Sequence, residues 1–127
     1  MNLTFNEEIF KNCRNKEQYF QYIEELVLLG REVQDNGIMA FGSEKWQNVT
    51  SYEREAIDLL CEGGPPNRLE FMLTTLLNTS DFTEDEYIKA VLFRVFVIFL
   101  QPGGISETEM KKLLLSHFGI QEYHNRI

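Results

Sequence analysis

Hydrophobic residues recur at steps of three and four along most of the chain, which is the spacing of amphipathic helices. The clearest stripe comprises Tyr19, Phe20, Ile23, Leu26, Val27, Gly30 and Val33. It predicts a helix of about five turns that ends at Asn36-Gly37, where glycine suits a left-handed cap. Asn15 and Gln18 have the spacing of a capping pair at its start.

Three further helix starts carry Ser or Thr followed three residues later by Glu, the capping-box pattern. They are Thr50 with Glu53, Thr83 with Glu86, and Ser106 with Glu109. We therefore predict helices over about 50–62, 84–100 and 106–118. Pro65-Pro66 opens one more helix, because proline suits the first helical turn.

Two segments are less regular. Residues 6–12 predict one or two helical turns, and residues 38–46 are compatible with either a short helix or a packed loop. Neither segment has the extended stripe that would decide between these structures.

Residues 95–100, Val-Phe-Val-Ile-Phe-Leu, are the densest apolar block of the chain. A helix this apolar must be surrounded by other elements. The pattern therefore predicts an all-α fold, a single domain over 1–127. It would have five or six helices in a bundle or orthogonal array around a central helix at about 84–100. Residues 120–127 form a tail that is either flexible or docked on the domain or on another chain.

The composition limits the partners. With 127 residues, one domain is expected, and the net charge of −8 argues against nucleic acid, which needs a basic patch. The apolar run 87–100 is too short for a membrane span and contains Lys89 and Arg94, so no membrane insertion is expected. The first residues lack a secretion signal, which favours a cytoplasmic protein with reduced Cys13 and Cys61.

The chain has few histidine and cysteine residues, which often act in catalysis or bind metal ions. The two histidines, His117 and His124, are the available bases, and we expect structural roles for both. Cys61 follows Asp58 near a helix end, which predicts a buried thiol with a raised pKa. The chain has no metal-binding motif and no phosphate loop. The sequence therefore predicts no catalytic, cofactor-binding or metal-binding residues.

Four large side chains gather in the least regular part of the chain. They are Met39, Phe41, Trp46 and Tyr52. Large apolar residues in such a segment either fill the core or contact a partner. They are therefore the candidate partner-contact residues, with core packing as the competing interpretation.

Two stretches resemble the cytoplasmic helical part of the flagellar stator MotA family. One is Arg31-Glu-Val-Gln-Asp-Asn-Gly37-Ile-Met-Ala40-Phe41. The other is Ile57-Asp-Leu-Leu-Cys-Glu62-Gly63-Gly-Pro-Pro66-Asn-Arg-Leu69. Together they cover under a fifth of the chain, which lacks that family's membrane helices. The resemblance implies a soluble helical relative that binds motor or other scaffold components.

These observations favour a non-enzymatic, cytoplasmic protein-interaction or scaffold module without a cofactor, which binds a protein partner or itself. Two alternatives remain open. One is a small enzyme subunit or ligand-binding regulator whose site is completed by a partner chain. The other is a soluble flagellar-motor-associated protein.

Overall fold

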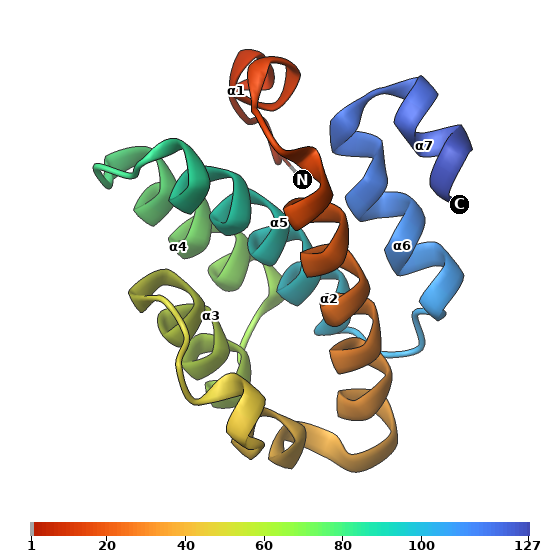
Figure 1. The fold of residues 1–127 in the computed structure, drawn as a ribbon. Helices are drawn as coiled ribbons and strands as arrows, with labels where there is room; N and C mark the ends of the chain where they lie inside the picture. Colours follow the sequence, from red (N-terminus) through yellow and green to blue (C-terminus); the bar gives the residue numbers. More distant parts are fainter. Residues whose placement is uncertain (1) are drawn as a thin grey trace.

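A computed structural model describes residues 2–127, except for the side chain of Lys45, and its regular elements in this range are helices (Figure 1). The α-helices are α1 (Glu7–Asn12), α2 (Lys16–Asn36), α3 (Ser51–Glu62), α4 (Pro66–Thr79), α5 (Glu84–Leu100), α6 (Glu107–Leu115) and α7 (Ile120–Arg126). Three short 3₁₀ helices are η1 (Gly37–Gly42), η2 (Glu44–Trp46) and η3 (Ser116–Phe118). The prediction of an all-α fold is confirmed.

The described residues form seven α-helices, where five or six were predicted. The additional helix is α7, which lies in the segment that the sequence suggested as a tail. Residues 38–46 form two 3₁₀ helices, a structure between the predicted short helix and the packed loop.

Helix α5 is the centre of the fold, as predicted. It contacts α1, α2, α3, α4 and α6, and Figure 1 shows it between α2 on one side and α3 and α4 on the other. Its apolar side chains are buried around most of the helix surface, from Ile88 to Leu100. A helix with no polar face can be stable in water only under this cover.

The capping boxes at Thr50 and Thr83 are both present. In α5, Thr83 Oγ1 accepts a hydrogen bond from the Glu86 N–H (3.2 Å) and Glu86 Oε1 accepts one from the Thr83 N–H (3.0 Å). Ser106 Oγ accepts from the Glu109 N–H (3.1 Å) and so caps α6. The local sequence therefore sets where these helices begin.

The capping pair predicted at Asn15 is wrong. Asn15 adopts a left-handed conformation with φ of 54°, and its side chain makes no cap hydrogen bond. Its carbonyl oxygen instead accepts from the Gln18 N–H at 3.4 Å. Asparagine tolerates this conformation better than most residues, and here it forms the sharp turn between α1 and α2.

Helices α2 and α5 approach each other closely at Gly30. A Cβ atom at this position would lie 3.2 Å from Phe96 Cε1, which is tighter than normal packing. One turn further on, the Gln34 amide donates to the Ile105 carbonyl (2.7 Å) and accepts from the Gly104 N–H (2.9 Å). These two hydrogen bonds join the end of α2 to the loop that leads into α6.

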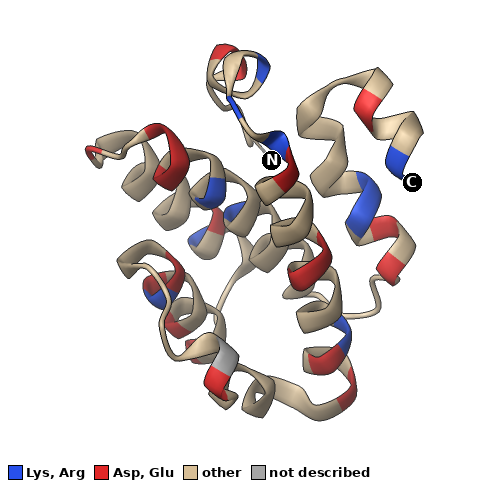
Figure 2. Cartoon of the chain, in the orientation of Figure 1, with Lys and Arg blue, Asp and Glu red and all other residues tan. Residues whose placement is uncertain are grey.

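Charged residues are spread over the surface, and Figure 2 shows acidic and basic residues interspersed along several helices. Among the side chains that the structure describes, two charged ones, Glu53 and Arg94, are buried. Tyr22 Oη donates to Glu53 Oε2 at 2.6 Å, and Glu53 Oε1 accepts from the Thr50 N–H at 2.9 Å. Burial and the Glu53 charge raise the pKa of Tyr22 well above its usual value. The Glu53 carboxylate thus links α2 to the start of α3.

We predict that Tyr22→Phe lowers the free energy of unfolding by about 1–3 kcal/mol, because it leaves a buried carboxylate oxygen without its donor. Urea denaturation followed by circular dichroism measures this change. Tyr123→Phe, which alters a half-buried tyrosine on α7, is the control and should change stability by under about 0.5 kcal/mol. Equal effects of both changes would contradict the proposed role of the Tyr22–Glu53 bond.

Candidate functional site

The four residues predicted to contact a partner do not form one surface. Phe41, Trp46 and Tyr52 are buried, with about a twentieth of each side chain exposed, whereas Met39 is 83% exposed. The structure therefore places three of the four in the core, in agreement with the competing interpretation of core packing. Met39 alone is available to another molecule.

Tertiary contacts explain this burial. The Trp46 ring lies 6.4 Å from the Phe93 ring of α5, measured between centroids. Tyr52 packs edge-to-face on Phe82 and its hydroxyl donates to the Leu73 carbonyl at 2.9 Å. Helix η2 thus lies over the side of α5 and completes its apolar cover.

The two histidines differ in how far they are buried. His117 is half-buried in η3, where its ring packs on Phe5 and Phe10 and its Nδ1 lies 3.0 Å from the Leu114 carbonyl oxygen. Burial lowers the pKa of His117, although the carbonyls of Leu114 and Leu113 act in the opposite direction. His124 is exposed on α7.

Cys61 is exposed, so the expectation of a buried thiol is wrong. It lies in the last turn of α3 and is not among the buried residues of that helix. Desolvation and the nearby Asp58 carboxylate still raise the pKa of the Cys61 thiol, the predicted direction. Cys13 is the buried thiol, and its Sγ donates to the Phe10 carbonyl at 3.2 Å.

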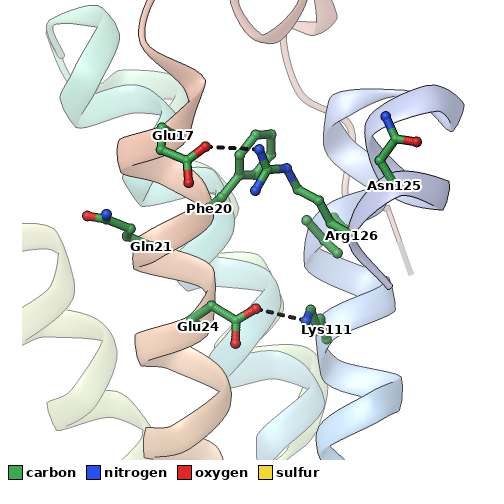
Figure 3. A pocket seen from close by; sticks show the side chains of 8 residues that line it. Glu17, Phe20, Gln21, Glu24, Lys111, Asn125 and Arg126 are labelled. Carbon is green, nitrogen blue, oxygen red and sulfur yellow. Dashed lines mark hydrogen bonds and ion pairs between the residues drawn. The ribbon is translucent and has the colours of Figure 1, made fainter.

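A polar pocket of about 320 Å³ lies where α2 faces α6 and α7 (Figure 3). Its lining residues are Glu17, Phe20, Gln21, Glu24, Lys111, Leu115, Asn125 and Arg126. The sequence did not indicate this pocket, because its residues come from three helices and form no local motif.

The cations of the pocket are paired. Lys111 Nζ lies 2.9 Å from Glu24 Oε1, and Arg126 Nη2 lies 2.9 Å from Glu17 Oε2. The Arg126 guanidinium also stacks 3.7 Å above the Phe20 ring, a cation–π contact. Since each cation already has a carboxylate partner, the pocket presents no excess charge to a charged ligand. Its main effect is to hold α7 on α2.

An apolar groove of about 360 Å³ lies between α6 and α7. It is lined by Lys112, Leu113, Ser116, Gly119, Ile120 and Tyr123. Ile120 is 69% exposed, and no residue of α7 is fully buried. The spacing of Ile120 and Tyr123, three residues apart, is the sequence signal that could have indicated an apolar face on this helix.

No protein-family model, characterised protein or solved structure matches the chain. The stretch 31–41, one of the two on which the predicted resemblance to the MotA family rests, covers the end of α2 and most of η1. The stretch 57–69 covers the α3–α4 junction. Neither stretch contributes to the α6–α7 groove.

None of the helices in residues 2–127 has both the length and the hydropathy needed to cross a membrane. Within the same range, no group of three or more His, Cys, Asp or Glu side chains is arranged to hold a metal ion.

We predict that Trp46→Ala lowers the free energy of unfolding by about 3–5 kcal/mol, because it removes a buried aromatic side chain. Met39→Ala, which truncates an exposed neighbour, should change it by under about 0.5 kcal/mol. Thermal and urea unfolding of both variants test this. A folded and equally stable Trp46→Ala protein would show that Trp46 is not part of the core.

The lowered pKa of His117 predicts that the stability of the fold depends on pH. Its pKa is lowered in the folded state, so the unfolded chain takes up a proton first as the pH falls below about 6.5. The folded state should therefore lose stability between this pH and the lower folded-state pKa.

The difference in unfolding free energy between pH 7.5 and pH 5.5 should be smaller in His117→Asn, which keeps a donor for Leu114 but does not titrate. His124→Asn is the matched control, since His124 is exposed. If both variants keep the pH dependence of the wild type, His117 is not its source.

Proposed function

We propose that the protein is a non-enzymatic interaction module that binds an amphipathic helix of a partner protein in the α6–α7 groove. The observation that carries this proposal is the exposed apolar groove around Ile120. Apolar side chains of a partner helix at positions i, i+3 or i+4, and i+7 would occupy the groove.

Charge further defines the partner. Lys112 is exposed at the edge of the groove, in a chain of net charge −8. A partner helix with an acidic residue beside its apolar positions would pair with Lys112 at the rim, where such pairs favour orientation and association rate. A basic helix would be attracted by the net negative charge of the protein. At the groove itself, however, its positive charges would lie next to Lys112 and be repelled by it.

The alternative of an enzyme subunit or ligand-binding regulator would use the α2–α6–α7 pocket. That interpretation is less favoured, because both cations of the pocket are paired with carboxylates. A cytoplasmic location and a link to flagellar motors stay predictions from the sequence.

We expect a photo-crosslinking residue at Ile120 to join the protein to a partner in extracts of its native cells. The same residue at Phe71, which is 70% exposed on α4, should give no such product. The captured partner is then identified by mass spectrometry and its affinity for the purified protein is measured.

The substitution Ile120→Asp should weaken that binding at least about ten-fold, since it places a charge in the apolar groove. Phe71→Asp is the control, and circular dichroism confirms that both variants are folded. Equal loss of binding in the two variants would contradict the groove as the site. Light scattering of the wild type distinguishes a partner protein from a second copy, because only the latter gives a dimer on its own.

A further inference from the structure

Arg94 lies in the middle of α5 and its side chain is completely buried, with 0% exposed. Its Nη2 donates to the carbonyl oxygens of Leu3 (3.1 Å) and Thr4 (2.9 Å), and its Nη1 donates to Thr74 Oγ1 (3.3 Å). Its Nε is buried without a hydrogen-bond partner. Each of these acceptors is neutral, and none of the ion pairs among the described residues includes Arg94.

This environment is unfavourable for a guanidinium. Buried charges in proteins are normally paired with an opposite charge, because neutral acceptors only partly replace water. Burial lowers the pKa of Arg94, while Tyr52, Tyr87 and Glu70 act in the opposite direction. The side chain nevertheless remains a cation, since arginine does not lose its proton in proteins. A carboxylate would satisfy it better than two carbonyl groups do.

The cover over Arg94 is the extended segment 2–6. The Asn2 N–H donates to Glu70 Oε1 on α4 (2.7 Å), and the Asn6 N–H donates to Tyr87 Oη on α5 (2.7 Å). Together with the two carbonyl groups on Arg94, these contacts use main-chain atoms of the segment. Main-chain contacts do not depend on the side chains, so another extended polypeptide can make them.

The segment also lies beside open space. A hollow of about 380 Å³, lined in part by Ile9, Leu77 and Phe82, adjoins Asn6 and Tyr87. A second hollow of about 300 Å³ adjoins Phe5 and His117. A longer or bulkier segment than residues 2–6 therefore has room for its side chains.

From these contacts we infer that the surface of α4 and α5 under residues 2–6 is a binding site for an extended acidic segment of another protein. A carboxylate of that segment pairs with Arg94 and displaces residues 2–6. The displaced residues, Asn2-Leu3-Thr4-Phe5-Asn6, contain no acid, so the incoming segment gains an ion pair that the internal one lacks. This site is separate from the α6–α7 groove, and the inference does not depend on the proposed function.

The test uses the full chain, labelled with ¹⁵N, as wild type and as Phe5→Gly. The latter loosens the internal segment by removing the ring that packs on Phe10 and His117. Two unlabelled peptides copy residues 2–6, one with Leu3→Asp and the other with the uncharged match Leu3→Asn, because the Leu3 side chain packs against the core whereas that of Thr4 is exposed. Nuclear magnetic resonance titration measures both affinities, and hydrogen exchange of the Asn6 amide reports displacement.

We expect the Asp peptide to bind Phe5→Gly at least ten-fold more tightly than the Asn peptide and to speed exchange of the Asn6 amide. Arg94→Met should abolish the preference. Thr74→Asp supplies an internal carboxylate beside Arg94 and should also abolish the preference for the Asp peptide. This variant replaces Arg94→Met in the test if the latter does not fold.

Three results would overturn the inference. Equal affinities for the two peptides would show that Arg94 does not select an acid. Unchanged exchange of the Asn6 amide on binding would show that residues 2–6 are not displaced. A dimer of the Phe5→Gly chain in light scattering, with exchanged N-terminal segments, would assign the site to a second copy of this protein instead.

Discussion

The fold depends on one constraint, the need to cover α5 on every side. Its apolar residues face all directions, so this helix would expose a large hydrophobic surface if any neighbour were missing. Helices α2, α3, α4 and α6 supply most of the cover, and the short segment around Trp46 closes part of what remains. Close contact at Gly30 brings α2 near enough for its side chains to interdigitate with those of α5.

This arrangement leaves little of the central helices for binding. The four hollows described above lie at the periphery, around the two ends of the described chain. The N-terminal segment and η3 meet there in an aromatic cluster of Phe5, Phe10, His117 and Phe118. Segments at the edge of a fold are covered by fewer contacts than the core and open at lower free energy. Both the α6–α7 groove and the site under residues 2–6 belong to this part of the molecule.

The buried polar groups show how distant segments are joined. Glu53 is held by Tyr22, 31 residues away, and Arg94 holds carbonyl groups 90 and 91 residues away. The two differ in their electrostatics. The Glu53 carboxylate accepts one hydrogen bond from a hydroxyl and one from a main-chain N–H, and the latter caps α3. Arg94, in contrast, donates only to neutral acceptors and has one nitrogen without a hydrogen-bond partner. Arg94 is therefore the group whose environment is least satisfied by this chain alone.

Local sequence determined the all-α class, the central helix and the starts at Thr50, Thr83 and Ser106. These features follow from periodicity and from hydrogen bonds between residues three apart. Tertiary structure decided which large side chains lie inside. Residues 38–46 have no stripe, so only the position of η2 over α5 shows that Trp46 is buried and Met39 exposed. Likewise, a single arginine in an apolar helix does not reveal its partners. The carbonyls that reach Arg94, and the groove around Ile120, exist only because packing brings together segments that no local pattern relates.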